Sequence, residues 1–162
     1  MIDHSLIIHK SKLYIFGGCD GNQEYGTLFK IKLQNSTLTK CESKGDVPSA
    51  RYGHTAVIYK DFMYVFGGWD GTRTLNDFYQ FSFSKYKTFF LITFFFSKNS
   101  LVSKFWYIEK PDMSVTPVSS VPSPRYRHSS CVVNKSIFIF GGISKLQEKH
   151  NDLYEYRIAY SA

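Results

Sequence analysis

The feature that most constrains the fold of this 162-residue chain is a pair of glycines that occurs three times, each time after a short strand-like triplet. The pairs are Gly17-Gly18, Gly67-Gly68 and Gly141-Gly142. A histidine precedes the first glycine of each pair by thirteen residues: His4, His54 and His128. An aromatic residue follows it by twelve or thirteen: Phe29, Tyr79 and Tyr154. Because the three copies agree at several positions with the same spacing, they indicate internal repeats, and repeats constrain the fold more than any local motif does.

The middle copy indicates what one repeat builds. Alternating and β-branched residues predict strands at 55–59, 62–66 and 78–83, and a fourth that contains Trp106. Lys60-Asp61 supplies a polar turn, and the second strand is expected to end at Gly67-Gly68. Paired glycines allow positive φ and a close approach of neighbouring chain. Four antiparallel strands in about fifty residues are the size of one propeller blade, so the chain is predicted to be all-β.

The repeat resembles the kelch motif. The residues that carry the resemblance are Pro48-Ser49-Ala50-Arg51-Tyr52-Gly53-His54, Tyr64-Val65-Phe66-Gly67-Gly68 and Asn76-Asp77-Phe78-Tyr79, matched in the third copy by Pro122 to His128, Gly141-Gly142 and Asn151-Asp152-Leu153-Tyr154. The first copy departs from the motif, with Gly26-Thr27 in place of Asn-Asp and Leu38 in place of a tryptophan. The resemblance implies a β-propeller of four-stranded antiparallel blades and, most often, a role in protein interaction.

Three repeats are expected, at about 1–48, 49–122 and 123–162, and the last is expected to lack its fourth strand. Complete propellers close with about four to eight blades. Closure of the ring is therefore expected to need further blades or other copies of the chain, and we interpret the chain as a fragment of a larger propeller.

The second repeat contains an aberrant insert at 84–101, which has no glycine, proline or acidic residue. Trp106 follows Tyr79 by 27 residues, whereas the family spacing is about nine. The residue types of the insert are those that A/T-rich codons favour, so we interpret it as translated intron or a gene-model error. The alternatives are an extra strand, a membrane-touching loop or an aggregation-prone segment.

Charge and cysteine content exclude some classes of function. The formal net charge is +7, but the lysines and arginines are scattered without a basic stripe, so neither nucleic acid nor a membrane is expected as a partner. The excess charge favours acidic proteins or peptides. The cysteines Cys19, Cys41 and Cys131 form no metal-binding spacing, and their odd number fits a reducing compartment, which predicts a cytoplasmic protein.

No catalytic motif, metal site or cofactor site is predicted. The residues assigned to the repeat architecture are Gly17, Gly18, Gly67, Gly68, Gly141, Gly142, His4, His54, His128, Tyr79, Tyr154 and Trp106. The histidines recur in one slot, which favours a structural role over a metal site. Arg51 and Arg125 have two interpretations: they bind a carboxylate of a partner, or, as repetition favours, carbonyls of the adjacent blade. Asp77 and Asp152 are expected to satisfy backbone groups of turns.

Residues that bind a partner are expected in the loops that differ between repeats. Trp69 and Arg73 are the strongest candidates because tryptophan and arginine are enriched in interface hot spots. Packing between blades is the alternative for Trp69. The remaining candidates are Tyr52, Arg51, Arg125, Tyr126 and Arg127.

These observations predict a non-catalytic adaptor that binds a protein or peptide through preorganised loops. One alternative is a kelch-propeller enzyme acting on a small molecule in the central channel. Another is a non-functional truncated gene product.

Overall fold

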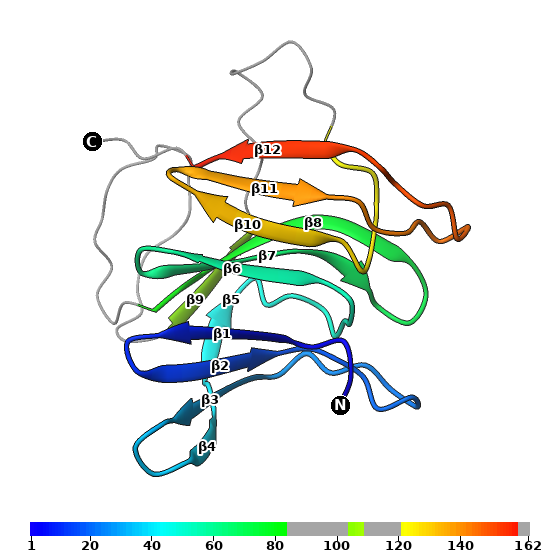
Figure 1. Cartoon of the computed structure of the whole chain (residues 1–162). Coiled ribbons are helices and arrows are strands. Elements are labelled where there is room, and N and C mark those ends of the chain that lie inside the picture. Colours follow the sequence, from blue (N-terminus) through cyan, green and yellow to red (C-terminus); the bar gives the residue numbers. More distant parts are fainter. Residues whose placement is uncertain (84–103, 109–120, 159–162) are drawn as a thin grey trace.

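The computed structural model describes residues 1–83, 104–108 and 121–158, with the backbone alone at 104–108, and this part of the chain is all-β. Its strands form three sheets, one for each glycine pair, and we call these sheets blades 1, 2 and 3 (Figure 1). No helix in the described residues is long and apolar enough to cross a membrane.

Blade 1 is a four-stranded antiparallel meander. Its strands are β1 (Ser5–His9), β2 (Lys12–Phe16), β3 (Leu28–Lys32) and β4 (Thr37–Lys40), paired in chain order. Alternation of side chains along β2 sends Tyr14 and Phe16 to one face, where both are buried. That face is the one that meets blade 2, so the alternation in the sequence determines which side of the sheet enters the core.

Blade 2 has five strands, one more than predicted. The chain supplies β6 (Thr55–Tyr59), β7 (Phe62–Trp69), β8 (Thr74–Ser82) and β9 (Lys104–Ile108) as an antiparallel sheet. The additional strand β5 (Ser43–Gly45) comes from the connection between blades 1 and 2 and pairs in parallel with β9. The link between repeats therefore covers the outer edge of blade 2, which sequence alternation did not indicate.

The glycine pair of blade 2 lies inside a strand, and the expectation that the strand stops there was wrong. β7 continues to Trp69 through a register shift between Phe66 and Gly68, and β8 begins at Thr74, four residues earlier than predicted. A β-bulge accommodates the glycines because they adopt positive φ, 62° and 106°.

Blade 3 has three antiparallel strands in the described residues: β10 (Ser129–Val133), β11 (Ser136–Phe140) and β12 (Leu153–Arg157). Its register repeats that of the other blades. Phe140 lies opposite Leu153, as Phe66 lies opposite Phe78 in blade 2.

Trp106 occupies the position that the repeat predicts for it. Its Cα partner is Phe81, and in blade 1 Leu38 is the partner of Ile31 at the equivalent position of the sheet. The insert at 84–101 lies outside the described residues.

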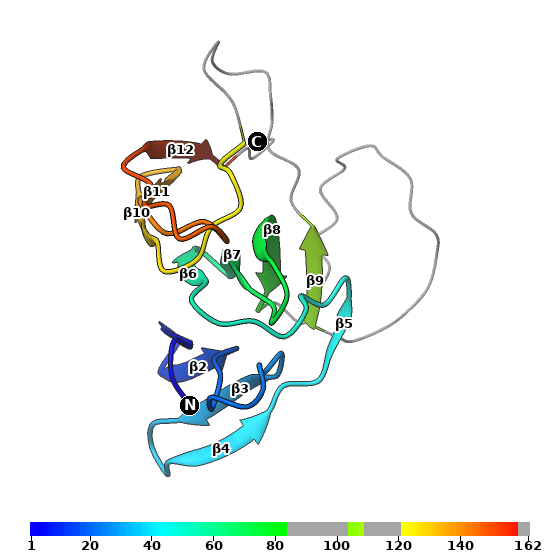
Figure 2. The ribbon, with the colours of Figure 1, turned by 90° about the vertical axis from the view of Figure 1, so that its right-hand side faces the viewer.

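Blade 2 lies between blades 1 and 3 in both views of the molecule (Figures 1 and 2). We call the face of each blade that points toward the next blade its front face, and the opposite one its back face. One apolar cluster joins the front face of blade 1, through Tyr14 and Phe16, to Met63 and Val65 on the back face of blade 2. A second cluster joins the front face of blade 2 to the back face of blade 3, and its buried members are Tyr64, Phe66, Phe78, Ile137, Ile139 and Ile158.

Candidate functional site

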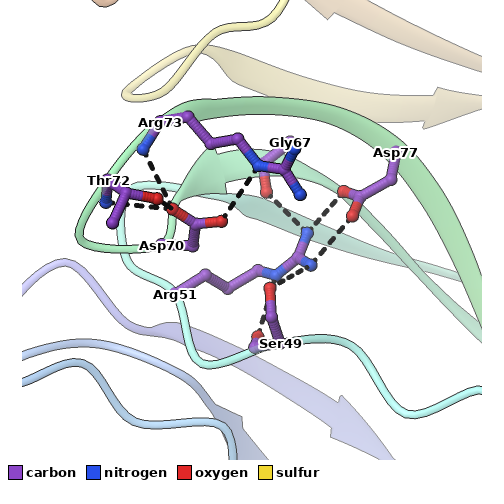
Figure 3. A network of polar contacts seen from close by, with 7 residues as sticks. All are labelled: Ser49, Arg51, Gly67, Asp70, Thr72, Arg73 and Asp77. Atoms are coloured by element: carbon purple, nitrogen blue, oxygen red, sulfur yellow. Dashed lines mark hydrogen bonds and ion pairs between the residues drawn. The ribbon is translucent and has the colours of Figure 1, made fainter.

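The arginine that opens blade 2 is buried inside that blade. Arg51 has no exposed surface, and its guanidinium binds both carboxylate oxygens of Asp77, at 2.5 and 2.9 Å (Figure 3). It also donates to the Gly67 carbonyl at 3.0 Å and to Ser49. The Tyr79 ring lies 5.3 Å from the guanidinium carbon. The guanidinium has five N–H donors, and all five make hydrogen bonds to residues of its own repeat.

Blade 3 repeats the arrangement. Arg125 is equally buried and binds Asp152 at 2.5 and 3.0 Å, the Gly141 carbonyl at 2.8 Å and Ser123, with Tyr154 beside it. The hydrogen bond from Arg125 holds the pKa of Asp152 below its usual value.

These contacts correct three expectations about the acidic and basic residues. Arg51 and Arg125 offer no surface to a partner, because both are fully buried and their guanidinium groups form hydrogen bonds within their own blade. The carbonyls that they bind belong to the same blade and not to the adjacent one. Asp77 and Asp152 pair with arginine side chains, whereas the sequence suggested turn backbone as their partner.

The histidines join successive blades. His54 lies with its Nε2 atom 2.8 Å from the Ser5 hydroxyl of blade 1, and its ring meets the edge of Phe16 at 5.2 Å. His128 repeats these contacts with Thr55, at 2.9 Å, and Phe66, at 5.1 Å. The position that these histidines share in the repeat is thus a point of contact with the preceding blade.

Burial, followed by the nearby arginines, lowers the pKa of His54 to about 3 and that of His128 to about 4. Both rings are therefore neutral near pH 7. Their perturbed pKa values follow from packing between blades, and the described residues contain no group of three or more side chains suited to a metal ion.

A cluster of aromatic side chains with one arginine lies where blades 2 and 3 begin, and we call it the opening patch. Its members are Tyr52, Trp69, Tyr126 and Arg127. Tyr126 is central, with its ring 6.2 Å from Tyr52 and 6.0 Å from Trp69, and with the Arg127 guanidinium carbon 5.7 Å from its centroid. Tyr52 and Trp69 are half-buried, and Arg127 is exposed. The sequence predicted all four as binding residues, and the fold brings them together from two blades.

Trp69 has both of the roles that the sequence left open. It packs across the blade boundary against Tyr126, and part of its surface stays accessible. Desolvation by burial raises the pKa of Tyr52, so the phenol of Tyr52 stays neutral beside the Arg127 guanidinium.

The opening patch is held by a contact between blades 1 and 3. Arg127 donates to Asp3 at 2.8 and 2.9 Å across 124 residues of sequence, and this hydrogen bond raises the pKa of Arg127. The backbone is tied as well: Gly53 donates to the Asp3 carbonyl, and Arg127 donates to that of Gly53. All three residues have positive φ, which is uncommon for arginine and aspartate and is maintained by these bonds.

Arg73 does not make any of the ring contacts that define the patch. It lies in the loop after β7, where it is exposed and contacts Asp70 at 3.4 Å (Figure 3). Asp70 also accepts from the backbone N–H groups of Thr72 and Arg73, so this loop is ordered by its own side chain. Asp20 orders the equivalent loop of blade 1 through Asn22 and Gln23.

Asp3 and Gln147 were missed as functional residues. Asp3 binds Arg127, and the Gln147 amide donates to the Tyr126 hydroxyl at 3.2 Å. Asp3 immediately precedes His4, as Arg127 precedes His128, so the repeat register would have identified it. No comparable signal points to Gln147, because the loops after the glycine pairs differ between repeats.

Family models match most of the chain. Residues 1–93 match the KLHDC2/KLHL20/DRC7 Kelch-repeats domain, and residues 124–159 match the Kelch motif. The chain belongs to the kelch-repeat family. Kelch repeats generally mediate protein–protein interactions, and kelch families are typically non-enzymatic. The three sheets of this kelch chain are accordingly blades of a partial propeller.

One curated relative is the "Leucine-zipper-like transcriptional regulator 1 homolog" of Drosophila melanogaster, which is 26% identical over 159 residues. The match covers 94% of this kelch chain but only 14% of the relative. The chain thus corresponds to a small part of that protein.

Proposed function

We propose that this kelch chain is a non-catalytic adaptor module that binds a protein or peptide segment at the opening patch. The observation that carries the proposal is the convergence of Tyr52, Trp69 and Tyr126 with Arg127 at one place on the boundary between blades 2 and 3. Aromatic residues and arginine are the side chains most enriched in interface hot spots.

The patch is preorganised, which favours binding. Tyr126 is fixed by Trp69 on one side and by the Gln147 amide on the other. Arg127 is fixed by Asp3 and by its own backbone hydrogen bond. Because these side chains are already ordered, little conformational entropy is lost when a partner binds.

The charge of the chain favours an acidic partner. Arg127 is exposed and has one carboxylate neighbour, and the formal net charge of the chain is +7. Because about half of the Arg127 side chain is exposed beside Asp3, a carboxylate of the partner can bind the same guanidinium. We also propose that the module works in the cytoplasm, since Cys19, Cys41 and Cys131 are free thiols.

Random peptides displayed on phage test this function when selected against the purified chain. We expect enriched acidic peptides that contain aromatic residues. Arg127→Ala should weaken their binding about tenfold, equivalent to about 1.4 kcal/mol. Arg157→Ala is the matched control, because Arg157 and Arg127 have nearly equal exposure, 54% and 53%, and each pairs with one carboxylate.

A second pair of variants tests the aromatic part of the patch. Trp69→Ala should weaken binding by about tenfold or more, whereas Leu38→Ala, at an exposed position of β4, should leave it unchanged. Peptides that bind both patch variants as tightly as the unchanged chain would locate the binding surface elsewhere and contradict the proposal.

A further inference from the structure

In the described part of the chain no sheet packs on the front face of blade 3, whereas the next blade covers the front faces of blades 1 and 2. Phe16 and Phe66, on the front faces of blades 1 and 2, are 1% and 3% exposed, because the next blade packs on them. Phe140 occupies the equivalent position in blade 3 and is 54% exposed. Its neighbour Leu153 is 63% exposed, against 5% for Phe78 at the same position of blade 2. Blade 3 therefore exposes an apolar front face whose residues correspond to those buried on the front faces of blades 1 and 2.

The polar groups on this face show the same difference. The backbone N–H of Gly18 donates to the Arg51 carbonyl, and that of Gly68 donates to the Arg125 carbonyl. Gly142 is their equivalent, and no described residue provides it with an acceptor of this kind. Ser129 is exposed and stands where Ser5 and Thr55 meet a histidine of the next blade.

The space around the first glycine of each pair also differs between blade 2 and blade 3. A methyl group on Gly67 would lie 2.8 Å from the Arg125 carbonyl oxygen and 3.0 Å from the His128 ring. A methyl group on Gly141 would meet nothing closer than 3.5 Å. Among the described residues, no following blade fills the space beside Gly141 that the next blade fills beside Gly17 and Gly67.

The chain carries the complementary surface at its other side. Leu6 and Ile8 on the back face of β1 are exposed, whereas Ala56, equivalent to Leu6, packs into the cluster between blades 1 and 2. His4 is exposed and is positioned as His54 and His128 are. Its Cβ atom packs against Gly18, as the Cβ atoms of the other two pack against Gly68 and Gly142.

We propose that the open front face of blade 3 binds the back face of blade 1 of a second copy of this chain. The stacking is the one that already joins blade 1 to blade 2 and blade 2 to blade 3. His4 of the second copy then lies against Phe140 and Ser129, and the carbonyl of Met1 of the second copy accepts from Gly142. Ile31 of the second copy packs on Leu153, as Tyr156 packs on Phe78 with ring centroids 4.5 Å apart.

This contact joins two different surfaces, so it either closes a ring or continues as a filament. The three described blades of two copies make six, a number within the range of closed propellers. In a closed ring of two copies neither an apolar front face nor an apolar back face remains exposed. The second copy is the occupant that we infer, because the chain itself presents both halves of the interface. The inference does not depend on the opening patch.

Sedimentation velocity of the purified chain from about 1 to about 100 μM, a range that brackets weak to moderate interfaces, measures the association. We expect a concentration-dependent dimer. Phe140→Asp and Ile8→Asp should each raise the dissociation constant by about tenfold or more. Leu146→Asp is the control, because Leu146 is an exposed leucine in the loop of blade 3 and lies outside both faces.

Cys131 provides a second readout that needs no variant. It is an exposed thiol in the middle of β10, opposite Phe138 on the front face, so its alkylation should slow as dimer forms. Two results would overturn the proposal: a monomer at every concentration, as expected if a different protein or a further blade covers this face; or association, as dimer or polymer, that Phe140→Asp and Ile8→Asp leave unaffected.

Discussion

Gly67 and Gly141 occupy equivalent positions with different surroundings, and this difference predicts how much an alanine at each position destabilises the fold. The two glycines have nearly the same backbone conformation, with φ of 62° and 70°. Alanine at either position meets the same left-handed strain, about 1–2 kcal/mol, and changes the entropy of the unfolded chain equally. The surroundings differ, because only Gly67 faces the next blade.

The difference between Gly67→Ala and Gly141→Ala therefore measures the contact between blades. At Gly67 the new methyl group would lie 2.8 Å from the Arg125 carbonyl oxygen and 3.0 Å from the His128 ring, both in blade 3. The contact with its own blade, 3.1 Å to the Leu75 carbonyl oxygen, has a counterpart at Gly141, 3.5 Å to the His150 carbonyl oxygen. Backbone atoms cannot swing aside, so blades 2 and 3 must separate slightly. We expect Gly67→Ala to lower the free energy of unfolding by about 1–3 kcal/mol more than Gly141→Ala does, as overpacking of a filled core does. Gly17→Ala should cost more still, since its methyl group would approach the Arg51 carbonyl oxygen to 2.5 Å.

Urea unfolding followed by circular dichroism gives the free energies, at a dilution where sedimentation shows the chain to be monomeric. This dilution matters because a second copy on blade 3 would cover Gly141 as well. The slopes of the transitions have to agree among the variants for the comparison to hold. If both variants lost the same free energy of unfolding, the packing of blade 3 on blade 2 would not be what excludes a side chain at Gly67, and the reasoning would be refuted.

Two further predictions concern the buried polar residues. The folded pKa values of His54 and His128, about 3 and about 4, lie below the ordinary 6.5, so the unfolded chain takes up these protons first. Stability is therefore full above about pH 6.5 and falls toward pH 4, by about 2 kcal/mol for each histidine between pH 7 and pH 5; an unchanged urea midpoint over this interval would contradict the assignment. Arg51→Met should lower the free energy of unfolding by about 3 kcal/mol because it leaves Asp77 without its partner. Arg73→Met, at an exposed pair, should change it by less than about 1 kcal/mol, and equal effects would argue against a structural role for Arg51.

Much of each blade could be predicted from the sequence because strands and tight turns depend on neighbouring residues. The alternation at 55–59 corresponds to β6 without change of bounds, and the polar pair Lys60-Asp61 forms the expected turn before β7. The register of the repeat also placed Trp106 opposite Phe81, in the position of Leu38. Side-chain periodicity in a strand is a local property, and three copies of it confirm one another.

The sequence by itself determined that this chain builds three sheets on one repeated pattern, with a histidine in every repeat and an arginine in the second and third. Only the tertiary structure decided what those side chains bind: Asp77 for Arg51, a hydroxyl of the preceding blade for His54, and Asp3 for Arg127. It also decided that Phe16 is buried and the equivalent Phe140 is not. The physical reason is that periodicity specifies which way a side chain points, whereas its partner depends on which sheet is stacked against it.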